Sequence, residues 1–149
     1  MVELNFTPFP NLTTDRLVLR QLNIDDANEI YLLRSDESVN KYLDRDKATA
    51  IEDATNFINK IKNAVAKNES LYWAITIKGN NSLIGTICLF SMDIEKDRAE
   101  IGYELMPKFQ GKGFMQESIS TVIKFAFDNL RIKTITATQT ADNSKSVTV

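Results

Sequence analysis

The clearest chemical signal lies at a junction between an expected strand and an expected helix. The junction is the segment Gln110-Gly-Lys-Gly-Phe-Met115. Its two glycines let the backbone turn tightly and bring N–H groups close to a ligand. The first N–H groups of the following helix have no partner within the helix, and the positive end of the helix dipole adds to them. The junction is therefore typical of a phosphate site, to which Lys112 adds a positive charge.

Two common phosphate-binding sequences do not fit this junction. A P-loop requires Gly-Lys-Ser/Thr after a longer loop, whereas Gly113 is followed by Phe114. A dinucleotide-binding fingerprint requires a third glycine, and Gln116 occupies its position. That fingerprint also requires a parallel βαβ unit, whereas the strand before this loop closes an expected antiparallel meander.

Histidine and cysteine usage narrows the chemistry further. The 149 residues include no histidine and a single cysteine, Cys88. Without histidine, the sequence excludes Ser-His-Asp and Cys-His nucleophilic machinery and the usual His-containing zinc sites, so we expect no metal. One cysteine cannot form an intramolecular disulfide, which favours a reducing cytoplasm. Cys88 lies between Ile87 and Leu89, and we expect a buried, inert thiol.

Charge and hydropathy indicate an ordinary soluble domain. The net charge is −2 at pH 7, with 43% hydrophobic and 26% charged residues. No apolar run approaches the roughly 20 residues that cross a membrane, and the N-terminus lacks the basic and apolar regions of a signal peptide. We therefore expect one cytoplasmic domain over residues 1–149, with neither a nucleic acid nor a membrane as its partner.

Hydrophobic periodicity predicts the elements that must position the junction. Period-two alternation indicates strands, and apolar spacing of three and four indicates amphipathic helices. The expected strands are 16–20, 71–78, 83–91, 99–106 and 133–139, and the expected helices are 23–34, 49–67 and 112–129. The order β-α-α-β-β-β-α-β is a mixed α/β class, a mainly antiparallel sheet flanked by helices.

Several segments together resemble one enzyme family. The junction resembles the pyrophosphate-binding signature of the GNAT N-acetyltransferases, Gln/Arg-x-x-Gly-x-Gly/Ala. Three further segments resemble its RimJ/RimL-like branch: Thr14-Asp-Arg-Leu-Val-Leu-Arg20, Glu100-Ile-Gly-Tyr103 and Asn143-x-x-Ser146. The resemblance extends from residue 14 to the last residue. Met115 departs from the signature's final Gly or Ala, although only its backbone need approach the cofactor.

The resemblance implies the GNAT fold and an acetyl-CoA-dependent N-acetyltransferase. The acetyl group would pass directly from acetyl-CoA to a primary amine in a ternary complex, the acceptor being a protein N-terminus or a small molecule. A bulge in strand 99–106 would splay it from strand 133–139, with pantetheine in the gap, and an N–H near Leu105 would polarise the thioester carbonyl. The implied cofactor-binding residues are Leu105 and Met106 for pantetheine, the amides of Gln110, Gly111, Lys112, Gly113, Phe114 and Met115 for the diphosphate, and Asn143, which would also cap a helix.

Proton transfer must then use groups other than histidine. Glu100 is the candidate general base, acting directly or through a water, and Glu104 on the same strand face is a weaker one. The alternative is that both are solvated strand residues. The resemblance makes Ser146 a candidate acid for the leaving thiolate, the alternative being a serine on a helix surface.

The end of the chain raises a further expectation. Relatives continue beyond the expected cap at Thr140–Asn143 with a helix and two more strands, so we expect a C-terminally incomplete GNAT domain. Strand 133–139 would then be an unpaired edge, which leaves two outcomes open, a destabilised domain or a homodimer that covers it. Two alternative functions follow: a module that binds CoA without turnover, and an interaction domain that does not bind CoA.

Overall fold

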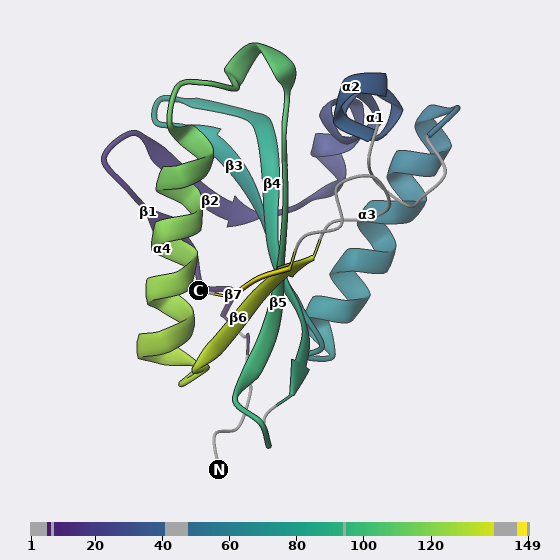
Figure 1. The fold of residues 1–149 in the computed structure, drawn as a ribbon. Helices are drawn as coiled ribbons and strands as arrows, with labels where there is room; N and C mark the ends of the chain where they lie inside the picture. Colours follow the sequence, from purple (N-terminus) through teal and green to yellow (C-terminus); the bar gives the residue numbers. More distant parts are fainter. Residues whose placement is uncertain (1–5, 7, 41–47, 94, 139–145, 149) are drawn as a thin grey trace.

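In the computed structural model, which describes residues 6, 8–40, 48–93, 95–138 and 146–148, seven strands form one sheet (Figure 1). Their order in the sheet follows their order in the chain, and all neighbours are antiparallel except the parallel pair β5 and β6. The strands are β1 (Leu12–Thr13), β2 (Leu17–Gln21), β3 (Leu71–Ile77), β4 (Asn80–Asp93), β5 (Arg98–Leu105), β6 (Thr134–Thr138) and β7 (Ser146–Thr148).

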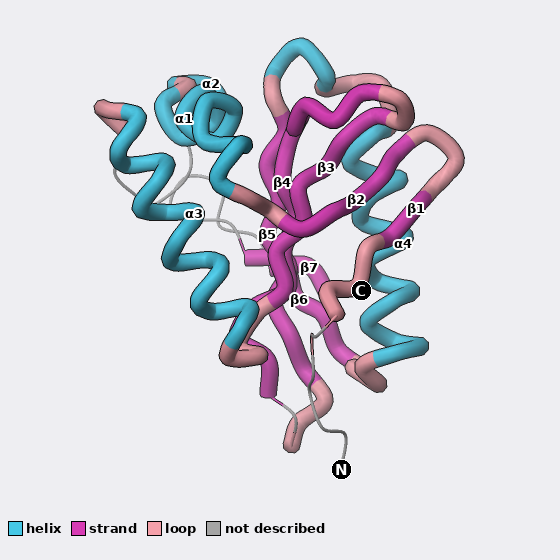
Figure 2. Tube along the Cα trace, turned by 180° about the vertical axis from the view of Figure 1, so that it is seen from behind, coloured by secondary structure: helices cyan, strands magenta, loops and turns pink. Residues whose placement is uncertain are grey.

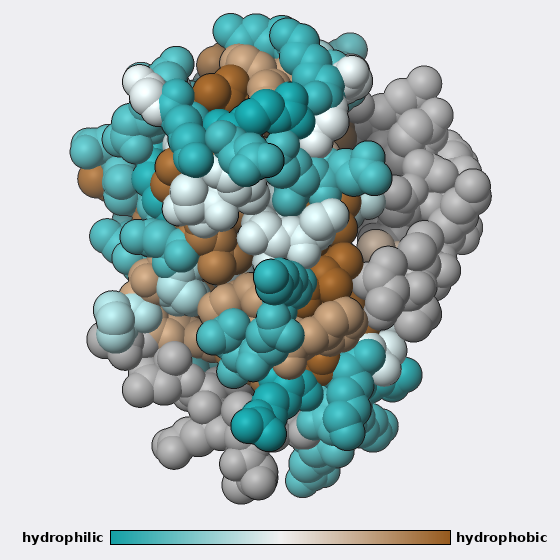
Figure 3. All heavy atoms as spheres, turned by 90° about the vertical axis from the view of Figure 1, so that its left-hand side faces the viewer, coloured by the Kyte–Doolittle hydropathy of each residue, from teal (hydrophilic) through white to brown (hydrophobic). Residues whose placement is uncertain are grey.

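The helices cover both faces of this sheet. One face carries α1 (Ala27–Ser35), α2 (Glu37–Asn40) and α3 (Ile51–Ala66), and the opposite face carries α4 (Phe114–Asn129), as Figures 1 and 2 show from two sides. Two short 3₁₀ segments, η1 (Ile24–Asp26) and η2 (Pro107–Phe109), lead into α1 and toward α4. On the side of the molecule where α4 lies, hydrophilic residues surround smaller apolar areas (Figure 3). None of the described helices is long and apolar enough to cross a membrane.

The core follows from the alternation of side chains along the central strands. Trp73 and Ile75 of β3 are fully buried in the cluster that includes Val122 and Ala126 of α4. Their neighbours Tyr72 and Ala74 belong to a second cluster on the α1 and α3 side. Because successive side chains of a strand point to opposite faces, a strand buried on both sides reads as a continuous apolar run.

The start of the first helix agrees with the sequence. Asn23 accepts a hydrogen bond from the backbone N–H of Asp25 at 2.8 Å, and Asp26 accepts one from the N–H of Asn23 at 2.9 Å. Arg20 of β2 forms two hydrogen bonds with Asp26, at 2.6 and 2.9 Å, which raise the pKa of the arginine. This polar network fixes η1, which leads into α1, against β2.

The predicted order of elements is confirmed, whereas the expectation for the end of the chain is wrong in two respects. Residues 146–148 form strand β7 rather than part of a helix, and Val147 and Thr148 have the β-branched side chains that suit strands. Thr136 of β6 pairs with both Glu100 and Thr148, so this strand is not the expected unpaired edge. That pairing removes the argument for a homodimer. The expected cap at residues 140–143 lies outside the described residues.

Candidate functional site

The centre of the site is the place where β5 and β6 part. The two strands pair in parallel from Arg98 opposite Thr134 to Ile101 opposite Ala137. Beyond Ile101, β5 continues to Leu105 paired with β4 (Figure 1), whereas β6 ends at Thr138, which pairs with Ser146 of β7. Among the described residues, the β5 edge from Gly102 onward therefore has no ladder partner on the β6 side.

Hydrogen bonding shows which groups of β5 face this opening. Met106 donates its N–H to the carbonyl of Ile84 at 2.9 Å, toward β4. Because successive residues of a strand direct their backbone groups to opposite edges, Leu105 and Tyr103 direct theirs toward the opening. The carbonyl of Leu105 accepts a hydrogen bond from the side-chain amide of Gln110 at 2.9 Å, on that same side.

The expected bulge is not in β5. The ladder between β4 and β5 is regular from Leu105 to Glu100, opposite Gly85 to Phe90. The register shift lies between Phe90 and Asp93, so the extra residue belongs to β4. The unpaired edge of β5 therefore begins where its described ladder with β6 ends, at Ile101 and Ala137, and the β4 side of this edge contains no bulge from Glu100 to Leu105.

The loop after β5 presents a row of backbone donors. Gly111 and Gly113 adopt φ values of +77° and +83°, which glycine reaches without strain. The first N–H of α4 that bonds back is that of Glu117, to the carbonyl of Gly113 at 3.0 Å. Within the described part of the chain, the N–H groups of residues 111–116 donate to no other group. These N–H groups and the helix dipole are the features that can accept an anion at the start of α4.

The other predicted cofactor residues differ in what they can offer. Met106 uses its N–H on Ile84 and its carbonyl on Phe109, so its backbone is largely engaged within the protein. Lys112 is exposed, whereas Phe114 is buried and Met115 packs against the core, so these last two would contribute backbone groups alone. Asn143 lies outside the described residues. For Ser146 the structure describes the backbone, as the first residue of β7.

The sequence did not indicate the group that supports this loop. Arg16, just before β2, donates to the carbonyl of Lys112 at 3.0 Å and to the carboxylate of Glu117 at 2.8 Å. The backbone N–H of Arg16 and the hydroxyl of Thr14 also donate to Glu117. Burial acts to raise the pKa of Glu117, but the hydrogen bonds from Thr14 and Arg16 outweigh it and hold this pKa below its ordinary value.

The face of β5 that lies on the α1 and α3 side of the sheet carries the two candidate bases. Glu104 lies across the ladder from Thr86, at the open end of the strand. Its Oε1 atom is buried. Glu100 lies four residues earlier, in the part of β5 that still pairs with β6, opposite Thr136. The sequence-based expectation that both glutamates share a face is confirmed by these registers.

Tyr72 and Cys88 surround Glu104 on this face. Burial raises the pKa of Tyr72, the charges of Glu104 and Cys88 raise it further, and a hydrogen bond from Thr86 acts against them. Burial, and then the charge of Glu104, raise the pKa of Cys88 to about 12. Glu104 is therefore set in a poorly hydrated, polar environment on the α1 and α3 side of the sheet.

Cys88 should resist alkylation in the folded protein. With a pKa of about 12, about one thiol in ten thousand is ionised at pH 8, although the residue is only half-buried. We expect iodoacetamide at pH 8 to leave native protein unmodified by mass spectrometry, while protein unfolded in urea gains one adduct. Rapid labelling of the native protein would contradict the raised pKa of this thiol.

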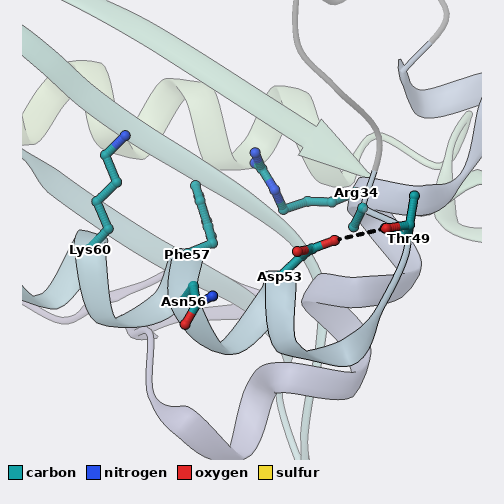
Figure 4. Close-up of a pocket in the computed structure, with 7 residues that line it drawn as sticks. Arg34, Thr49, Asp53, Asn56, Phe57 and Lys60 are labelled. Carbon is teal, nitrogen blue, oxygen red and sulfur yellow. Dashed lines mark hydrogen bonds between the residues drawn. The ribbon is translucent and has the colours of Figure 1, made fainter.

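A pocket of about 490 Å³ opens beside this cluster (Figure 4). It is lined by Arg34, Ala48, Thr49, Asp53, Asn56, Phe57 and Lys60. The guanidinium of Arg34 lies 3.9 Å from the centre of the Phe57 ring, and Phe57 packs edge-on against Tyr72 at 5.7 Å. One wall of the pocket is therefore a single aromatic layer away from the environment of Glu104.

The carboxylate of Asp53, which lines this pocket, is engaged by backbone N–H groups at the start of α3. It accepts hydrogen bonds from the backbone N–H groups of Thr49 and Ala50 at 2.9 and 3.3 Å, and these lower its pKa. The carboxylate therefore serves as a helix cap. Among the described residues, no group of three or more His, Cys, Asp or Glu side chains could hold a metal ion.

Comparison with known proteins identifies the class of protein to which this fold and site belong. The family described as "Acetyltransferase (GNAT) domain" matches residues 16–149. The chain belongs to this family and is a GNAT-type N-acetyltransferase.

A relative in sequence agrees with this assignment, and two solved structures share the fold. The "Uncharacterized N-acetyltransferase YoaA" of Bacillus subtilis (strain 168) is 35% identical over 138 residues, 93% of this chain and 78% of the relative. RimL, a ribosomal-protein alpha-N-acetyltransferase solved with coenzyme A, superposes with a TM-score of 0.79 at 18% identity, covering 90% of this chain and 77% of RimL. Spermidine N-acetyltransferase from Vibrio cholerae, solved with CoA and spermine, gives 0.72 at 22% identity, covering 83% and 71%.

Proposed function

We propose that this protein transfers an acetyl group from acetyl-CoA to a primary amine by direct attack in a ternary complex. The observation that carries the proposal is the coincidence of two features. The β5 edge toward which Leu105 and Tyr103 direct their backbone groups has no described ladder partner beyond Ile101, and the free N–H groups of residues 111–116 lie at the end of that edge. Pantetheine would lie in the opening, and the diphosphate would bind the amides at the start of α4.

The backbone and one carboxylate supply the chemistry that we propose. Acetyl-CoA provides an activated thioester, so that the amine forms the new N–C bond as the C–S bond breaks. The N–H of Leu105 or Tyr103 would donate to the carbonyl oxygen as negative charge develops there. Glu104 is the neighbour of Leu105 and would accept the amine proton, whereas Glu100 lies about 13 Å further along the strand. Ser146 stays a prediction for the proton donor to the leaving thiolate.

The acceptor would enter from the side opposite the diphosphate. The pocket between Arg34, Phe57 and Lys60 lies on the α1 and α3 face, the face that also carries Glu104. An amine bound there would reach the thioester without displacing pantetheine. The acceptor class that we propose is a primary amine of a peptide N-terminus or a small molecule, as in the RimJ/RimL-like branch. The single cysteine and the use of acetyl-CoA favour the cytoplasm.

A thermal-melt experiment with acetyl-CoA, using NAD as the control, tests this proposal. Ligand at 100 times its Kd adds about 2.7 kcal/mol to the free energy of unfolding, or roughly 5–10 °C for a domain of this size. We expect the shift with acetyl-CoA alone, because NAD also carries a diphosphate but lacks pantetheine.

An amine panel then separates the remaining functions. Acetylation of a peptide or small amine supports the enzyme, whereas binding without transfer indicates a CoA-binding module that does not turn over. No shift with acetyl-CoA would overturn the proposed site and leave an interaction domain as the alternative.

A further inference from the structure

Arg16 connects the first part of the chain to the loop that would bind the diphosphate. Its guanidinium donates to the carbonyl of Lys112 at 3.0 Å and to Glu117 at 2.8 Å, and it lies 4.4 Å from the centre of the Phe114 ring. These three residues belong to the loop and to the first turn of α4. A single side chain therefore contacts the loop, the first helical residue and a carboxylate one turn further on.

The hydrogen bond from Arg16 to the carbonyl of Lys112 determines the direction of the next backbone N–H, that of Gly113. In a planar trans peptide, the C=O and the following N–H point in opposite directions. Since the carbonyl of Lys112 points to Arg16, the N–H of Gly113 points away from Arg16. A carbonyl that accepts from a cation also polarises its peptide, which makes the N–H a stronger donor.

Arg16 also controls the charge beside the anion site. Glu117 is the acidic residue in the first turn of α4, and its side chain is 21% exposed. Without a partner, this carboxylate would repel a diphosphate at the start of the helix. The ion pair with Arg16 neutralises it and turns it toward β2.

We propose that Arg16 is a positioning residue for the diphosphate of CoA, acting from behind the loop. It holds the peptide between Lys112 and Gly113 with its N–H toward the ligand, and it neutralises Glu117. This role rests on the proposed function, because it assumes that residues 111–116 bind the diphosphate.

Calorimetric titration with CoA tests this role in the full chain, at a temperature below every unfolding midpoint. Losing the charged hydrogen bonds should weaken the binding of Arg16→Ala by about 10- to 100-fold. Arg16→Lys keeps a charge beside Glu117 but cannot bond to two acceptors and stack at once, so we expect a loss of about tenfold. The exposed Arg98, at the paired end of β5, supplies the control Arg98→Ala, which should bind like the wild type.

The double variant Arg16→Ala/Glu117→Gln separates positioning from simple packing. Removing the unneutralised carboxylate should recover several-fold of the lost CoA affinity, whereas loss of packing alone would not be recovered. If the wild type fails to bind CoA, the proposed function and this role both fail. If the wild type binds CoA, and Arg16→Ala and Arg16→Lys bind it as tightly as the wild type does, only the role of Arg16 is overturned. If Arg16→Ala does not fold, Arg16→Lys decides between these outcomes.

Discussion

Replacing Gly111 by aspartate should weaken acetyl-CoA binding by about a hundredfold while leaving the domain folded. Gly111 is the first of the residues whose N–H groups are free, and a Cβ added to it meets nothing within 4 Å. Its φ of +77° is a conformation that Asp and Asn tolerate best among other residues. Two unit charges of like sign about 4 Å apart near a protein surface repel by about 4 kcal/mol. Since a factor of ten in affinity corresponds to about 1.4 kcal/mol, the expected hundredfold loss requires only part of this repulsion.

Gly111→Asn is the matched control for this charge. Asparagine has nearly the same shape and the same backbone demand, and it carries no charge. We expect its Kd for acetyl-CoA, measured by calorimetry, to change less than tenfold, and both variants to unfold near the temperature of the wild type. Equal losses in the two variants would assign the effect to the backbone, and no loss in either would place the diphosphate elsewhere.

Local signals in the sequence predicted most of the elements around this loop. The apolar spacing along α3 and α4 and the alternation along β2 and β5 depend on neighbours in the chain. The loop itself is also local, since two glycines before a helix are enough to indicate free amides. These features therefore follow from short-range geometry that the sequence contains.

The parts that escaped prediction depend on contacts between distant segments. Arg16 and Glu117 are 101 residues apart, and no periodicity joins them. The β5–β6 ladder ends at Ile101 and Ala137, whereas the sequence-based expectation was a bulge, which β5 does not contain where it pairs with β4 from Glu100 to Leu105. β7 pairs with β6 although a cap-like Asn143 indicated a helix, because tertiary pairing overrides a weak local preference.

The choice between Glu100 and Glu104 is also a question of distance along a strand. The sequence favoured Glu100, and the geometry favours Glu104, which adjoins Leu105 at the open end of β5. Glu104 also shares its surroundings with Tyr72 and Cys88, close to the wall of the pocket formed by Phe57. A base must lie within hydrogen-bond reach of the amine, or one water away, and a separation of about 13 Å does not allow this for both residues.

Glu104→Gln should therefore lower kcat by a factor of about 10² to 10⁴, the usual contribution of a general base. The amide keeps the shape of the side chain but cannot take the amine proton. The KM for acetyl-CoA should stay near the wild-type value, because the strand edge and the amides of residues 111–116 are unchanged. The measurement is a steady-state assay with the best amine from the acceptor panel.

Glu100→Gln supplies the comparison, since it makes the same chemical change on the same face of the same strand. We expect its kcat to fall less than tenfold, and thermal melts of both variants should show that the fold is retained. A large loss in Glu100→Gln with little change in Glu104→Gln would restore the sequence-based choice, and the amine would then have to be reached through a water within the paired part of β5. Small losses in both would mean that the acceptor arrives already deprotonated, so that the backbone N–H groups and the positioning of the amine account for the rate.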